Sequence, residues 1–128
     1  MKKIGLVGGT GPESTLVYYR EINRLVREKT GGTQFPELMI DSVDLYKILP
    51  MCKAENYDSL TDYLAASVKR LAAGGADYVA FTAVTSHLVF PQVSALCPVP
   101  MVSIPEATAE YAAARCLGST VTARRWTK

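Results

Sequence analysis

Two short segments of this 128-residue chain concentrate the side chains that are able to do chemistry. One of them, residues 82–87, carries the hydroxyls of Thr82, Thr85 and Ser86 and ends with His87, the single histidine of the chain. An imidazole changes its charge near neutral pH, so this segment is a candidate for proton transfer. A lone histidine also commonly caps or braces a neighbouring helix, and the residues alone leave both roles open. Their spacing predicts no Ser/His/Asp triad.

The second segment, residues 8–15, is rich in glycine and reads GGTGPEST. It joins a short apolar run, residues 4–7, to an amphipathic stretch, and backbone N–H groups at the start of a helix favour an anion. The anion is a phosphate or the carboxylate of an amino acid. Because the segment lacks the GxGxxG spacing and no lysine follows it as in a P-loop, a nucleotide is the weaker interpretation. A tight turn that needs glycines for positive φ is an alternative.

The cysteines offer a third candidate. Cys52 falls near the end of a predicted loop, residues 42–52, while Cys97 and Cys116 lie beside predicted turns. An odd number of cysteines without metal-ligand spacing predicts free thiols and no metal site. From the residues alone, an incidental thiol is the favoured interpretation of Cys52.

Alternating strands and helices must position these segments. The hydrophobic pattern predicts strands at 4–7, 37–43, 78–81 and 101–104, and helices at 13–29, 57–73, up to about 96, and from about 105. Leu16, Tyr19, Ile22 and Val26 mark the expected buried face of the first helix, and Pro91 is expected in the first turn of the third. The fold class is therefore α/β, a parallel sheet flanked by helices. Ligands of such sheets bind outside the carboxyl ends of the strands, where all three candidate segments lie.

Composition narrows the class of protein further. The chain is 48% apolar and 20% charged with a net charge of +2, which is typical of a globular domain. It shows no basic stripe interleaved with aromatic residues, so nucleic acid is not an expected partner. No apolar run approaches the roughly 20 residues that span a bilayer, and the first apolar run is too short for a signal peptide. We therefore expect a cytoplasmic protein without a membrane partner.

Four segments together resemble the aspartate/glutamate racemase family: residues 3–15 with Tyr18-Tyr19, 42–44, 85–90 and 104–108. They cover residues 3–115 in the family's order and spacing. The resemblance implies two similar α/β domains with the active site in the cleft between them, one catalytic thiol on each domain, and no need for pyridoxal phosphate or metal. It implies that residues 1–97 are the first domain and 98–115 a linker with the first elements of a truncated second domain. Residues 116–128 then form an atypical tail.

The resemblance also assigns site residues. It gives the catalytic position to Thr82, facing the α-carbon of aspartate or glutamate. It gives substrate contacts to five further residues: Thr10, Cys52, Ala83, Val84 and Thr85. The 128-residue chain alone is expected to be inactive. A truncated core would expose apolar surface, which predicts self-association as a homodimer.

One departure from the family pattern bears on the chemistry. The family's first cysteine usually lies five residues before the histidine that matches His87, and Thr82 holds that position here. A cysteine ionises near pH 8.5 and an alcohol, like water, near about 15.7, a gap of about 10 kcal/mol against forming the base. Three outcomes stay open. The missing second cysteine is the base and Thr82 relays a proton, which favours one enantiomer; another group such as His87 or Cys52 acts; or the protein binds acidic amino acids without racemising them.

Overall fold

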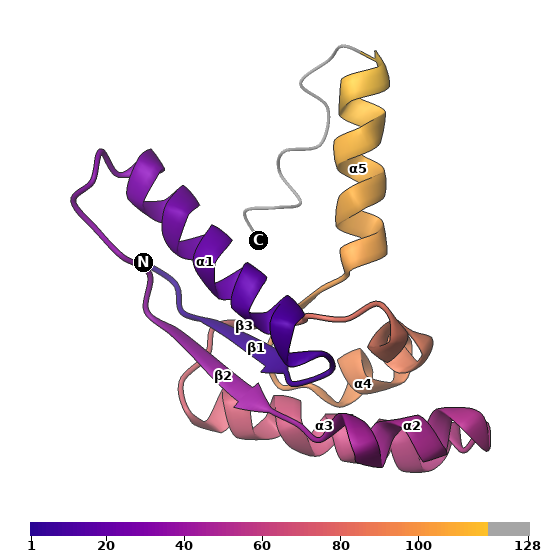
Figure 1. Cartoon of the computed structure of the whole chain (residues 1–128). Coiled ribbons are helices and arrows are strands. Elements are labelled where there is room, and N and C mark those ends of the chain that lie inside the picture. Colours follow the sequence, from indigo (N-terminus) through magenta and orange to yellow (C-terminus); the bar gives the residue numbers. More distant parts are fainter. Residues whose placement is uncertain (118–128) are drawn as a thin grey trace.

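Four parallel strands form a single sheet in the computed structural model, which describes residues 1–117 (Figure 1). They are β1 (Ile4–Gly8), β2 (Leu38–Ser42), β3 (Tyr78–Phe81) and β4 (Met101–Val102), in the order β2-β1-β3-β4. In register, Ile4 lies opposite Leu38 on one side and Tyr78 on the other. The α/β class and the parallel sheet expected from the sequence are confirmed.

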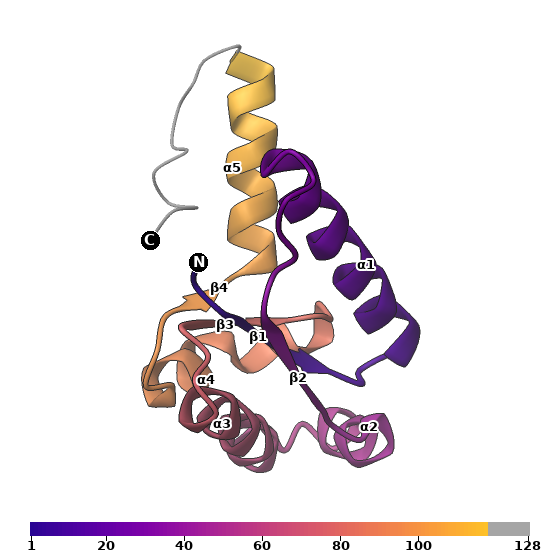
Figure 2. The same cartoon turned by 90° about the vertical axis from the view of Figure 1, so that its left-hand side faces the viewer.

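Helices cover both faces of the sheet. They are α1 (Pro12–Lys29), α2 (Leu45–Lys53), α3 (Tyr57–Ala73), α4 (Phe90–Leu96) and α5 (Ile104–Leu117), with a 3₁₀ turn, η1 (Thr85–Val89), before α4. The chain steps from β1 to β2 in one direction and then across to β3 and β4 in the other. Right-handed crossovers therefore place α1 on one face and α3 and α4 on the opposite face, as Figure 2 shows. In both views α5 rises from the end of β4 on the side of α1.

The hydrophobic core lies between the sheet and α3. Leu60, Leu64, Val68 and Leu71 line the inner face of α3, as their spacing predicts, and pack against strand residues such as Phe81. Burying a side chain of this size contributes about 1.5–3 kcal/mol. Asn56 caps the helix by accepting a hydrogen bond from the Ser59 N–H at 3.3 Å. This half of the fold is therefore rigid enough to position the loops that follow β1 and β3.

An ion pair also fastens β2 to α3. The Arg70 guanidinium donates to Asp41 at 2.8 Å, and the Ser67 hydroxyl donates to the same carboxylate at 2.6 Å. The hydrogen bond from Arg70 holds the pKa of Asp41 below its ordinary value, and the bond from Ser67 adds to the effect. The charged carboxylate therefore stabilises the folded state.

The predicted buried face of α1 is only half right. Ile22 and Val26 are half-buried, but Leu16 is 66% exposed and Tyr19 48%, and Thr15 is the buried residue of this helix. The reason is that α1 meets the sheet through its first turn, and within residues 1–117 other elements leave most of Leu16 and about half of Tyr19 uncovered.

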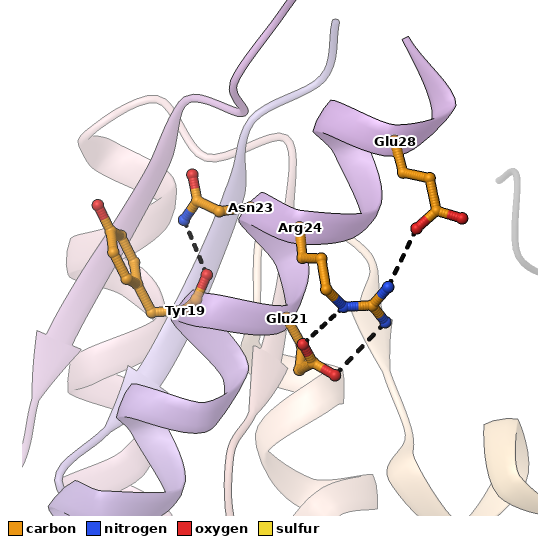
Figure 3. Close-up of polar contacts among 5 residues, drawn as sticks. All are labelled: Tyr19, Glu21, Asn23, Arg24 and Glu28. Atoms are coloured by element: carbon orange, nitrogen blue, oxygen red, sulfur yellow. Dashed lines mark hydrogen bonds and ion pairs between the residues drawn. The ribbon is translucent and has the colours of Figure 1, made fainter. Parts of the chain in front are cut away.

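The opposite, polar surface of α1 carries Arg24, which pairs with Glu21 at 2.9 Å and Glu28 at 3.0 Å (Figure 3). Such exposed pairs add little to the stability of the fold, because solvent screens the two charges.

Residues 42–52 are not a loop as predicted, because residues 45–53 form α2. Asp44 begins the helix by accepting a hydrogen bond from the Tyr46 N–H at 2.9 Å, and Ile48 anchors it in the core. The helix was not predicted because it has only nine residues and contains Pro50, a residue that usually indicates the end of a helix. Cys52 therefore lies on a helix near its carboxyl end.

The remaining expectations concern single residues and the chain's end. Pro91 lies in the first turn of α4, as predicted. Within residues 1–117 no helix is long and apolar enough to cross a membrane. Cys116 belongs to α5, while residues 118–128, most of the expected tail, lie outside the described residues.

Candidate functional site

The loops after β1 and β3 meet at the edge of the sheet where the strand order reverses. The Thr82 N–H donates to the Val7 carbonyl at 3.3 Å, and the Ser14 hydroxyl donates to the Thr82 carbonyl at 2.8 Å. The crevice at such a reversal point is the usual ligand site of open parallel sheets. The segments 8–15 and 82–87, which are far apart in the sequence, are therefore brought together as expected.

A directed chain of hydrogen bonds joins the two loops. The Thr82 hydroxyl donates to the Val7 carbonyl at 3.0 Å, since a carbonyl can only accept. In the 3.4 Å contact between the two threonine hydroxyls, Thr15 is then the donor to Thr82. Thr15 in turn accepts from the Gly9 N–H at 3.0 Å. The order is Gly9 to Thr15 to Thr82 to Val7, so the hydrogen of the Thr82 hydroxyl is committed to the backbone.

The burial of Thr82 also indicates that its hydroxyl is bound within the protein. Its side chain is 2% exposed and Thr15 is buried beside it. Within residues 1–117, the Thr82 oxygen therefore faces protein rather than solvent. An alcohol in this setting serves the framework of the site, and it would have to leave Val7 before it could pass a proton to a substrate.

Gly9 fits the turn after β1 for a steric reason. Its φ is +89°, and a Cβ at this position would lie 2.2 Å from the Val43 carbonyl oxygen. The Val43 N–H also donates to the Gly8 carbonyl at 2.9 Å, which holds the two segments in contact. The tight-turn explanation of the glycines therefore applies to Gly9 and, through a φ of +48°, also to Gly11. A Cβ at Gly11 would meet no atom of the described residues within 4 Å, so only the backbone conformation favours glycine there.

Thr10 carries the strongest indication of a ligand. It is 8% exposed, and its hydroxyl has no hydrogen-bond partner in the part of the chain that the structure describes. A buried polar group without a partner costs about 1–3 kcal/mol. Helix α1 begins next to it, after Gly11, and no side chain of the described residues caps its amino end. Helix amino ends carry a partial positive charge, so the hydroxyl and the helix together favour an anionic group.

The loop after β3 supplies the outer part of the site. Val84 is 67% exposed and Thr85 is also exposed, while Ala83 is half-buried with its carbonyl bound to His87 Nδ1 at 3.0 Å. These three residues follow Thr82 directly and so lie at the same edge of the sheet. Their side chains and backbone are accessible for contacts with a small molecule.

Among the described residues, no hydrogen bond joins Cys52 to the loops after β1 and β3. It is half-buried on α2 and packs against the core on the face opposite α1. All three cysteines are free, as the sequence predicts. Within residues 1–117 no three His, Cys, Asp or Glu side chains come together as a metal site would require.

An open cavity of about 530 Å³ lies elsewhere, along the carboxyl half of α1 and the turn after it. Arg24 and Glu28, drawn in Figure 3, are among the residues that line it, together with Arg20, Asn23, Arg27, Gly31, Gly32 and Phe35. The lining residues on α1 begin at Arg20, about 12 Å along the helix from its start at Pro12, which follows Thr10 and Gly11. The cavity is therefore not part of the candidate site.

The sequence placed Ser14 and Thr15 in the candidate segment 8–15 but predicted no contact for either side chain. Both side chains hydrogen-bond to the loops around Thr82 from the first turn of α1. The signal was present in the sequence as two adjacent hydroxyl residues directly after the glycine-rich turn, where a helix begins.

Comparisons with known proteins agree with this geometry. A family model described as Asp/Glu/hydantoin racemase matches residues 7–125. A proposed Asp/Glu racemase from Yersinia pestis has a TM-score of 0.85 and 30% sequence identity, over 92% of this chain and 50% of its own. An aspartate racemase homologue from Pyrococcus horikoshii has a TM-score of 0.81 and 42% identity, over 90% of this chain and 50% of its own. The chain thus spans about half the length of each.

Proposed function

The chain belongs to the Asp/Glu/hydantoin racemase family, and from this premise we propose that it forms one half of a cofactor-independent racemase of aspartate or glutamate. The observation that carries the proposal is the Thr10 hydroxyl, which has no partner among residues 1–117, beside the amino end of α1, which no side chain of those residues caps. An acidic amino acid brings the carboxylate that such a place favours. The reaction is abstraction of the α-proton and its return to the opposite face.

The roles of the substrate contacts follow from their places. Thr10 donates its hydroxyl to a carboxylate, and the backbone N–H groups at the start of α1 add to this anion site. Val84 and Thr85, both exposed, contact the rest of the substrate, with the Ala83 backbone next to them. Cys52 contributes least, since it is half-buried on α2 and a thiol is a poor partner for a carboxylate.

The proton chemistry depends on a second half. The Thr82 hydroxyl donates to Val7 and is buried, and forming an alkoxide there is about 10 kcal/mol harder than forming a thiolate. A base supplied by a second domain is therefore the working base, and Thr82 takes part only by relaying a proton after leaving Val7. An enzyme with one good base favours one enantiomer.

The proposal keeps residues 1–97 as most of the first racemase domain and 98–115 as the segment that leads toward the second. Within that segment β4 still pairs with β3 in the sheet of the first domain, and α5 then rises away from it (Figure 1). The apolar side chains of α1 that stay exposed among the described residues, such as Leu16 and Leu25, are the expected contact for a second half. A second copy of the chain, as a homodimer, is the alternative cover for the same face.

A second candidate function is favoured by Thr82 itself. Because its hydroxyl is bound within the framework, the site is also suited to holding an acidic amino acid without any chemistry. A binding protein of this kind would use the same substrate contacts but would have no base to abstract the α-proton.

Solvent deuterium exchange separates the two candidates. The chain is joined to a second racemase half, incubated in D₂O with L-aspartate, D-aspartate, L-glutamate or D-glutamate, and the α-proton is followed by NMR. Incorporation of deuterium, faster for one enantiomer, supports the racemase. Saturable binding without incorporation supports the binding protein and contradicts the racemase. The 128-residue chain alone is the control and is expected to exchange nothing.

A further inference from the structure

His87 has a partner at each of its two ring nitrogens. Nδ1 lies 3.0 Å from the Ala83 carbonyl, and the backbone N–H of Ile104 donates to Nε2 at 3.1 Å. A backbone N–H can only donate, so Nε2 must present a lone pair and Nδ1 must carry the hydrogen. The ring is therefore the neutral Nδ1–H tautomer, and it has no lone pair left for a substrate.

Two aromatic rings hold the imidazole in this orientation. Phe90 stacks on it, with ring centres 5.4 Å apart and planes 7° apart. Phe81 meets it edge-on, also at 5.4 Å. Phe81 is the last residue of β3 and Phe90 the first of α4, so the orientation of the ring is set by two elements of the core.

The partners of His87 belong to different parts of the molecule. Ala83 lies in the loop that the proposed function places against the substrate, directly after Thr82. Ile104 is the first residue of α5, whose initial N–H groups have no partner inside the helix. The ring thus supplies the Ile104 N–H with an acceptor from outside α5, while Ser103 serves the Glu106 N–H at 3.3 Å.

We propose that His87 is a positioning residue that couples the substrate loop to the start of α5. Through Nδ1 it fixes the direction of the Ala83 carbonyl, and through Nε2 it fixes where α5 leaves the sheet. One side chain, held by Phe81 and Phe90, therefore sets both the conformation of residues 82–85 and the place where α5 begins. The coupling rests on the proposed function only in that this loop contacts the substrate; the contacts themselves are independent of any activity.

The tautomer is measured directly, because the chain has a single histidine and its ring signals need no assignment. The 128-residue chain is labelled with ¹⁵N in the imidazole, and long-range proton–nitrogen spectra are recorded at neutral pH without ligand. The expected pattern shows hydrogen on Nδ1 and a lone pair on Nε2. Hydrogen on Nε2, or averaging between the two tautomers, overturns the proposal.

Two substitutions then separate the two contacts. His87→Gln retains an acceptor that reaches the Ile104 N–H, whereas His87→Asn retains only a donor near the Ala83 carbonyl. Hydrogen exchange of the Ile104 amide is expected to be about tenfold faster or more in His87→Asn and close to that of the unchanged chain in His87→Gln. In His87→Gln, the amide signals of residues 83–85 are expected to shift instead.

Equal exchange at Ile104 in both variants, or unshifted loop amides in His87→Gln, contradicts the coupling. If the variants do not fold, the tautomer of the unchanged chain still decides. None of these measurements contains substrate, so a failure here is distinct from a failure of the racemase assay. An Nδ1–H ring together with no deuterium incorporation would retain the positioning role and remove the racemase.

Discussion

Removing the Thr15 hydroxyl tests the hydrogen-bond chain that joins the two loops. In Thr15→Val the buried Gly9 N–H loses its acceptor and Thr82 loses a donor, while the shape of the side chain is nearly kept. An unsatisfied buried N–H costs about 1–3 kcal/mol. In Thr82→Val the Val7 carbonyl still accepts a hydrogen bond from the backbone N–H of residue 82. The expected loss of stability is therefore smaller, about 0.5–1.5 kcal/mol.

Urea unfolding of the 128-residue chain, followed by circular dichroism, measures these costs. With a slope of about 1–3 kcal/mol/M, Thr15→Val lowers the midpoint by roughly 1 M. The double variant is expected to lose less than the sum of the two single losses, because both remove the same threonine–threonine contact.

Thr85→Val is the matched control, since Thr85 is exposed and its change is expected to stay within about 0.5 kcal/mol. A Thr15→Val variant no less stable than Thr85→Val would refute the directed chain. Strict additivity in the double variant would show that the 3.4 Å contact contributes nothing.

Three further predictions follow from individual contacts. Asp41→Asn is expected to lower the stability of the fold at neutral pH and to make the stability fall less steeply in acid. A lowered pKa means that the Asp41 carboxylate stabilises the fold fully above its ordinary pKa of about 3.9 and that this contribution is lost as the pH falls through the pKa of the folded state. Unfolding curves from pH 7 down to about 2 measure the difference. Gly9→Ala is expected to lower the free energy of unfolding by more than about 3 kcal/mol. Gly31→Ala is expected to lower it by roughly 1 kcal/mol, because the φ of Gly31 is +65° but a Cβ there would meet no atom of the described residues within 4 Å; thermal unfolding compares the two variants. Thr82→Cys in a chain joined to a second half is expected to raise racemisation by about tenfold or more, seen by polarimetry, and unchanged activity with the fold intact would count against Thr82 at the thiol position.

The sequence predicted those elements whose apolar pattern matches their real surroundings. Residues 57–73 and 78–81 agree residue for residue with α3 and β3, because both are packed in the core of this half. The stripe on α1 was only half right. An apolar pattern indicates that a face is to be covered but not which element covers it, and within residues 1–117 Leu16 stays 66% exposed while Ile22 and Val26 are half-buried. Helix α2 was hidden by its shortness and by Pro50.

The candidate site shows the same division. Topology alone placed Thr10 and Thr82 at one edge of the sheet, because both follow parallel strands. The partners of each hydroxyl depend on side-chain rotamers and the angle at which α1 begins, which no spacing encodes. For that reason the role of Thr15, the committed hydrogen of Thr82 and the two-sided contact of His87 came only from the structure.

The central claim is that the amino end of α1 with Thr10 receives the carboxylate of an acidic amino acid. Titration of the ¹⁵N-labelled 128-residue chain with aspartate and glutamate tests it most directly, with Thr10→Val as the control. Saturable shifts of the amides of Thr10, Gly11 and Thr85, lost in Thr10→Val, are the predicted result. Shifts confined to the arginine-lined cavity along α1, or no saturable shift at residues 10–15 and 82–85, would contradict the account.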